Sequence, residues 1–172
     1  MDNTNMELPP QSAVEKMQPT GCCPVFDPAQ WDEKEIVWQN KQFVKDHILS
    51  FYHIPLTLNG KVKKNGKKII RAQADIPDYL MLVDEKSKWG ADIYIEVSKT
   101  VQKTKNINLS GTFLTKVFEG RYKNIGIWAK EMDDYVKSKD KTSDKLYYFY
   151  TTCPTCAKIY GKNYVVLFAK VD

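Results

Sequence analysis

Two pairs of cysteines have the clearest spacing for chemistry in this chain. Cys22 and Cys23 are adjacent, and Cys153 and Cys156 are separated by a Pro-Thr dipeptide. Four thiolates complete a tetrahedral zinc site, and a Cys-x-x-Cys pair is a common half of such a site. If the two segments pack against each other, we expect all four cysteines to be ligands and zinc to be the cofactor.

The Cys-x-x-Cys pair also admits a redox interpretation. Residues 146–151 are predicted to form a strand, and a dithiol between a strand and a short helix is a setting for thiol–disulfide exchange. Residues 157–162 are too few for the full helix of a βαβ unit, which argues against a thioredoxin fold. Metal binding, redox exchange and unligated reduced thiols therefore all remain open.

A second constellation is the alternation of side chains along residues 92–98, which is typical of a strand. Asp92, Tyr94, Glu96 and Ser98 share one face, because successive side chains of a strand point to opposite sides. A carboxylate that aromatic neighbours shield from water is suited to acid–base catalysis and could activate a water molecule. Glu96 is therefore the candidate catalytic residue, and the alternative is an exposed glutamate on a surface strand.

Aromatic side chains supply candidate walls for a ligand pocket. We assign this role to Tyr94, Tyr148, Trp128 and Trp89, since aromatic rings combine apolar area with a polar tip. Trp128 lies on the apolar stripe of a predicted helix, where packing in the core is the commoner role. No Ser-His-Asp or Cys-His order is apparent around the two histidines, so a hydrolytic triad is disfavoured.

The elements that position these residues include an amphipathic helix predicted over residues 122–139. Gly120, just before it, suits a sharp turn from strand to helix. A second helix is predicted over residues 60–74, and we interpret its run of lysines as a solvated face. The apolar residues of the first helix recur every three or four positions: Tyr122, Ile125, Trp128, Ala129, Met132, Tyr135 and Val136.

The remaining pattern predicts two successive units of strand, helix, strand and strand, together spanning residues 47–172. Residues 21–46 are expected to be an N-terminal extension that contains a β-hairpin with its turn at residues 39–42. Residues 1–20 are polar without periodicity and are expected to be a disordered leader. The strands are predicted over residues 47–58, 79–83, 91–99, 109–118, 146–151 and 163–171, and residues 152–162 are a connection.

The segment Phe118–Lys139, FEGRYKNIGIWAKEMDDYVKSK, and the strand Asp92–Val97 resemble the GyrI-like family of small-molecule-binding domains. The resemblance covers roughly residues 48–171. It implies an α+β fold of two β-α-β-β half-domains in a pseudo-symmetric arrangement, with an aromatic pocket and an acidic residue between them. Some such proteins are implicated in hydrolysing reactive small molecules, and others only bind them. The CCP and CPxC segments depart from the general family and suggest a cysteine-containing subfamily.

Composition places further bounds on partners. The chain has 172 residues and a formal net charge of +5, which is a mild excess and a weak case for nucleic acid. No apolar run has the length of a membrane span, and no signal peptide is apparent. We therefore expect a cytoplasmic protein with a small-molecule ligand and candidate hydrolase activity, without nucleic-acid or membrane partners. A zinc-binding structural or redox dithiol protein is the alternative.

Overall fold

The computed structural model describes residues 23–171. Its core is a sheet that closes on itself, because β1 pairs both with β4 and with β5. The predicted leader and Cys22 lie outside the described residues. The barrel strands are β1 (Lys34–Phe51), β3 (Met81–Ser87), β4 (Gly90–Glu96), β5 (Lys105–Glu119), β6 (Ser143–Tyr150) and β7 (Tyr164–Val171).

Neighbouring strands are antiparallel, in the order β1-β4-β3-β6-β7-β5 and back to β1. A short strand, β2 (Ile54–Pro55), turns back and pairs antiparallel with the end of β1. The helices are α2 (Leu58–Arg71), α3 (Ile125–Ser138) and α4 (Pro154–Tyr160), with 3-10 turns η1 (Pro28–Gln30) and η2 (Tyr122–Asn124). The prediction of a mixed α+β domain is confirmed.

The predicted hairpin at residues 36–44 is wrong, because these residues belong to one continuous strand, β1. The turn-favouring Asn40 does adopt a positive φ of 53°, but its effect is a bulge between Trp38 and Lys41. The Asn40 backbone N–H donates to the Ser110 hydroxyl at 2.8 Å. A bulge bends a strand without reversing it, so β1 stays one strand and runs through the predicted boundary at residue 46.

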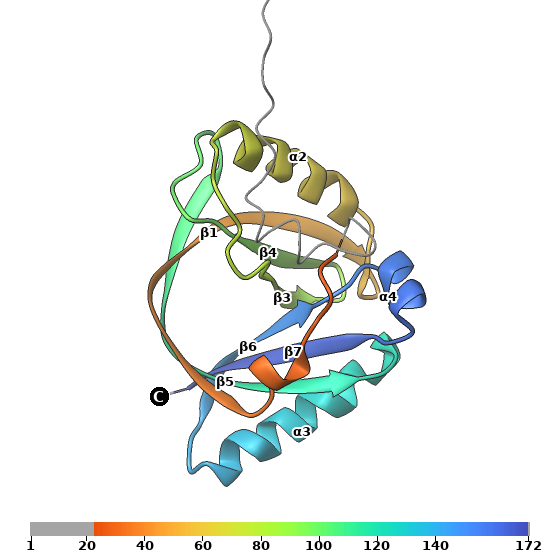
Figure 1. Cartoon of the computed structure of the whole chain (residues 1–172). Helices are drawn as coiled ribbons and strands as arrows, with labels where there is room; N and C mark the ends of the chain where they lie inside the picture. Colours follow the sequence, from red (N-terminus) through yellow and green to blue (C-terminus); the bar gives the residue numbers. More distant parts are fainter. Residues whose placement is uncertain (1–22, 172) are drawn as a thin grey trace, which may run out of the picture.

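The two longer helices cover the outside of the barrel at well-separated places (Figure 1). On α2, Ile69 packs with Val44 of β1 and Ile93 of β4. On α3, Trp128 packs with Leu167 of β7 in a separate cluster. Both helices therefore bury an apolar stripe against the outward-facing side chains of the sheet.

Apart from the short β2 and α4, the order of strands and helices is β1, α2, β3, β4 followed by β5, α3, β6, β7. A pseudo-symmetric relation between the two units stays a prediction. The predicted connection at residues 152–162 contains the short helix α4. Pro154 occupies its first turn, the Cys153 sulfur accepts from the Cys156 backbone N–H, and Gly161 ends the helix at a φ of 71°. A start with proline and an end with left-handed glycine are regular helix signals.

The barrel interior is filled mainly with aromatic side chains, together with several aliphatic ones. Phe43, Phe113 and Phe168 are each at most 1% exposed there. Phe26 and Trp31, which precede β1, pack on the same cluster from outside the strands. Phe26 approaches Phe149 with a ring-centroid distance of 6.3 Å, and Trp31 approaches Phe168 at 5.6 Å. The segment before β1 thus contributes two aromatic rings that pack against the interior cluster.

Candidate functional site

Strand β4 directs its alternate polar side chains into the aromatic interior. Tyr94 belongs to the interior cluster and is 3% exposed, and Glu96 is 2% exposed. Asp92 shares their face through strand alternation, while Ile93 and Ile95 pack outward beneath α2. Carboxylates are seldom buried so deeply without partners, so the contacts of Glu96 and Asp92 determine what the site can do.

Glu96 lies at one end of this polar row and is held by a cation and by backbone amides. The Lys41 ammonium is 2.5 Å from Glu96 Oε1, and the backbone N–H of Asp78 donates to Oε2 at 2.9 Å. Burial lowers the pKa of Lys41, but its hydrogen bonds to Glu96 and Asp78 outweigh that effect and raise the pKa. The charged Lys41 therefore compensates the buried carboxylate and connects it to the surface, because the Asp78 side chain is 48% exposed.

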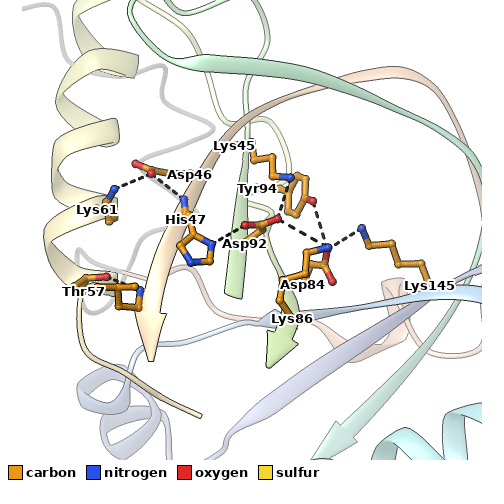
Figure 2. Close-up of polar contacts among 11 residues, drawn as sticks. Lys45, Asp46, His47, Thr57, Lys61, Asp84, Lys86, Asp92, Tyr94 and Lys145 are labelled. Atoms are coloured by element: carbon orange, nitrogen blue, oxygen red, sulfur yellow. Dashed lines mark hydrogen bonds and ion pairs between the residues drawn. The ribbon is translucent and has the colours of Figure 1, made fainter. Parts of the chain in front are cut away.

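The other end of the row is a cluster of two aspartates and three lysines (Figure 2). Asp84 on β3 and Asp92 on β4 are directly opposite each other. Lys86 and Lys145 approach Asp84 Oδ2 at 2.5 and 2.7 Å, and Lys45 lies 2.9 Å from Asp92 Oδ2. Like charges on opposing strand positions repel, so these ammonium groups are what allow both carboxylates to remain buried.

His47 also contacts Asp92, through Nδ1 at 2.9 Å. Burial raises the pKa of Asp92, but the hydrogen bonds from His47 and Lys45 and the charges of nearby lysines lower it by more. The pKa of Asp92 is therefore below its usual value. Gly90 makes room for the His47 ring, since a Cβ at position 90 would lie 2.8 Å from Nε2.

Two tyrosines connect the aspartate cluster to the aromatic interior. The Tyr94 hydroxyl donates to Asp84 at 3.5 Å, and the Tyr94 and Tyr147 rings meet edge to face at 5.6 Å. Burial, followed by the charges of Tyr94 and Asp84, raises the pKa of Tyr147 to about 12. Tyr147 therefore remains a protonated hydrogen-bond donor at neutral pH.

The structure brings Tyr94 and Glu96 together but places the other predicted ligand-binding residues elsewhere. Trp128 is a buried residue of α3 itself and stacks on Phe118 at 5.6 Å. Tyr148 faces outward and packs with the outer clusters, because the inward positions of β6 are Tyr147 and Phe149. Trp89 is 50% exposed in the turn between β3 and β4.

Asp84 and Lys45 are site residues that the sequence analysis missed. The alternation of β3, in which Leu82 and Asp84 share a face, is the same signal that identified Glu96. Asp84 was not assigned to this face because the predicted strand ends at residue 83, whereas β3 continues to Ser87. Lys45 lies beyond the predicted turn of the incorrect hairpin, so its inward face could not be recognised.

Three of the four predicted metal ligands converge at the N-terminal end of α4. The sulfur atoms of Cys23, Cys153 and Cys156 all lie within 4.8 Å of one another. The Cys153 backbone N–H donates to the Cys23 sulfur at 3.4 Å, and the Tyr160 hydroxyl donates to the Cys23 carbonyl at 2.5 Å. Three thiolates fit a soft metal ion such as zinc, so this cluster is compatible with metal binding.

Solved structures with a similar fold show the fold class of this chain. The C-terminal domain of EcmrR matches with a TM-score of 0.64 at 8% identity, over 83% of this chain and 98% of that chain. An uncharacterized conserved protein from Listeria innocua matches with a TM-score of 0.61 at 11% identity, over 82% and 92% of the two chains. A hydrolase from the same organism matches with a TM-score of 0.59 at 10% identity, over 83% and 92%. These proteins have GyrI-like folds, and so does this chain.

The family follows from the sequence match. Residues 13–171 match the model of the family described as Bacterial hydrolase, and the chain belongs to that family. None of the curated proteins matches the chain. Among the described residues, the helices are too short or too polar to cross a membrane.

Proposed function

We propose that the chain binds a small molecule at the polar face of β4 and hydrolyses it. The observation that carries this proposal is the row of Asp92, Tyr94 and Glu96, which lies against a cluster of aromatic side chains inside a GyrI-like barrel. Aromatic walls with a few convergent polar groups are the usual composition of a small-molecule site. Membership of the Bacterial hydrolase family supports hydrolysis as the activity.

In this proposal Glu96 is the general base. Its carboxylate takes a proton from a water molecule while the water oxygen bonds to the electrophilic carbon of the ligand and the bond to the leaving group breaks. The proton then passes from Glu96 to the leaving group, so the reaction consumes one water and needs no other reactant. Water reaches the carboxylate from the side of Lys41 and Asp78, which are the more exposed partners of Glu96.

The ligand would enter where the interior is closed by residues outside the strands. Phe26 and Trp31 are the aromatic members of the interior cluster that no barrel strand holds. Their displacement opens apolar surface without breaking a strand pair, whereas displacing Phe43 or Phe168 would disturb the barrel. A predominantly apolar, electrophilic ligand fits this route, because the lysines at the opposite end are engaged with aspartates.

Saturable hydrolysis of activated neutral esters tests the activity. Wild-type protein is incubated with p-nitrophenyl acetate and p-nitrophenyl butyrate, and release of nitrophenolate is measured by absorbance. We expect rates that saturate with substrate, and we expect product formed in ¹⁸O-labelled water to carry one labelled oxygen. Rates equal to those of the heat-denatured protein with both esters, and with an epoxide such as styrene oxide, would contradict hydrolysis.

A structural zinc site is a second candidate function, favoured by the convergence of Cys23, Cys153 and Cys156. Zinc–sulfur bonds of about 2.3 Å place tetrahedral ligands about 3.8 Å apart, so the three sulfurs need only a small movement to bind one ion. Cys22, adjacent to Cys23 in sequence, is the proposed fourth ligand. Zinc there would tie the segment before β1 to α4. Redox exchange between the same thiols is the competing use.

Metal analysis separates these two uses of the cysteines. Protein purified under reducing conditions should contain about one zinc per chain, and Cys156→Ser should lose it. A strong chelator should lower the melting temperature of the wild type and leave that of the variant unchanged, because metal binding stabilises the folded state. Metal-free protein that reversibly loses two hydrogens to oxidised glutathione would instead support a redox dithiol.

A further inference from the structure

An exposed apolar cluster lies where β1, β2 and the β3–β4 turn meet. Phe51, Tyr52 and Trp89 have exposed fractions between 50% and 57%, and Ile54 and Leu56 are 63% and 67% exposed. Leu49 is also 57% exposed and hydrogen-bonds through its carbonyl to the Leu56 backbone N–H at 2.9 Å. We call these six residues the aromatic tip. Contiguous exposed apolar side chains of this kind mark interaction surfaces.

Backbone hydrogen bonds and ring contacts hold the residues of the aromatic tip in place. The backbone N–H of Ser50 donates to the Trp89 carbonyl at 2.8 Å, and that of His53 donates to the Lys88 carbonyl at 3.1 Å. Phe51 and Tyr52 lie 5.8 and 5.3 Å from the Trp89 ring. The three rings therefore form one ordered group outside the core.

Positive charge lies directly beside these rings. The Lys88 ammonium is 4.9 Å from the centre of the Tyr52 ring and 5.1 Å from that of Trp89. Glu85 on β3 is in contact with His53, which follows Tyr52 of the aromatic tip, at 2.6 Å. Lys88 therefore places a cation directly beside two rings of the aromatic tip.

Helix α2 continues this surface with more cations. The Leu49 backbone N–H donates to the Thr57 hydroxyl at 2.9 Å, so the aromatic tip is anchored at the start of α2. Asp46 is paired with Lys61. Among residues 23–171, no carboxylate lies within ion-pair distance of the remaining cations of the α2 surface, which line a shallow hollow there: Lys63, Lys64, Lys67, Lys68 and Arg71.

We propose that the aromatic tip and the outer face of α2 dock on an anionic lipid surface. Tyrosine and tryptophan favour the boundary between headgroups and acyl chains, and lysines beside them favour anionic headgroups. A symmetric contact between two copies would bring Lys88 and the α2 cations of both chains together. A nucleic acid would use the rings but gain no stacking from Leu49, Ile54 and Leu56. The combination of aliphatic, aromatic and cationic side chains therefore favours lipid.

Vesicle co-sedimentation tests this docking. The full chain is mixed with vesicles of phosphatidylcholine alone and with vesicles of equal parts phosphatidylcholine and phosphatidylglycerol. We expect pelleting with the anionic vesicles only and its loss at high salt. Lipids that carry bromine on their acyl chains should quench the fluorescence of the wild type more than that of Trp89→Phe.

Two double variants and one charge-matched control test which surface of the protein binds the vesicles. Lys63→Glu with Lys67→Glu should weaken binding to the anionic vesicles at least about tenfold, and Leu56→Ser with Trp89→Ser should weaken it similarly. The control is Lys123→Glu with Lys130→Glu, at exposed positions of η2 and α3. It changes the net charge as much as the α2 variant does and should leave binding to the vesicles much less affected. Equal losses in the two charge variants, or no pelleting with anionic vesicles, would overturn the proposal. Sedimentation velocity that shows self-association lost on changing the aromatic tip would assign the surface to a second copy instead.

Discussion

Each buried carboxylate in this barrel lies against at least one ammonium group. Glu96 is paired with Lys41, and Asp84 is paired with both Lys86 and Lys145. A buried charge pair contributes little net stability compared with an apolar pair, but removing one partner leaves an uncompensated charge and is costly. The lysines are therefore part of the site, because without them the acidic residues could not remain in the aromatic interior.

The depressed pKa of Asp92 predicts how stability depends on pH. A carboxylate with a lower pKa in the folded than in the unfolded state stabilises the fold at pH values above its unfolded pKa of about 3.9. This stabilisation is lost as the pH falls from there through the folded pKa. Asp92→Asn should lower the free energy of unfolding by about 2 kcal/mol at pH 7, and the difference from wild type should shrink in acid.

Urea denaturation of both proteins between neutral and acidic pH measures that difference. The exposed Asp144 provides a matched control, and Asp144→Asn should have a small effect at every pH. A difference between wild type and Asp92→Asn that stays constant down to the lowest pH would show that the ionised Asp92 does not stabilise the fold.

Among the secondary-structure elements, the turn between β5 and η2, which leads into α3, depends on Gly120. Its φ is +142°, its backbone N–H donates to the Asn163 carbonyl at 3.0 Å, and a Cβ there would lie 3.3 Å from the Trp128 ring. The prediction of a sharp turn at this glycine is confirmed. The helix itself begins as the 3-10 turn η2, and regular α3 starts at Ile125, three residues later than predicted.

Replacing glycine with alanine should have opposite effects on the free energy of unfolding at two positions in this region. Gly120→Ala should lower the free energy of unfolding by about 1–3 kcal/mol, because alanine at positive φ is strained. Gly126→Ala should raise it by about 0.5–1 kcal/mol, because position 126 is in α3 with open space around it and alanine is the better helix former. Urea denaturation measures both, and equal effects of the two substitutions would contradict this assignment.

In the whole molecule, the spacing of apolar residues predicted individual helices and strands better than it predicted the closure of the sheet into a barrel. The apolar stripe of α3 and the alternation of β4 are local patterns, and both were recognised from the sequence. The closure of the barrel depends on pairs such as Lys34 with Thr115, which are far apart in the chain and have no local signature. The position of Tyr148 was missed for a related reason, since alternation identifies two faces of a strand but not which one faces the interior.

The segment before β1 joins the two candidate sites into one arrangement. Cys23 contacts Cys153 and Tyr160 near α4, and Phe26, three residues later, packs against Phe149 and Tyr164 at the barrel. The sequence placed the cysteines and the aromatic strand near each other through β6, which leads into Cys153. The structure adds that the N-terminal segment returns to the same place and closes the interior.

The most direct test of Glu96 as the general base is the steady-state turnover of Glu96→Gln with the ester or epoxide that the wild type hydrolyses. The glutamine keeps the shape of the side chain and an oxygen acceptor for the backbone N–H of Asp78, but it cannot take a proton from water. Its melting temperature is measured to confirm folding, and Glu131→Gln, at an exposed position of α3, is the control. We expect a fall in kcat of about 10²–10⁴ for Glu96→Gln and unchanged turnover for the control. Turnover that survives in folded Glu96→Gln would contradict the assigned role of Glu96.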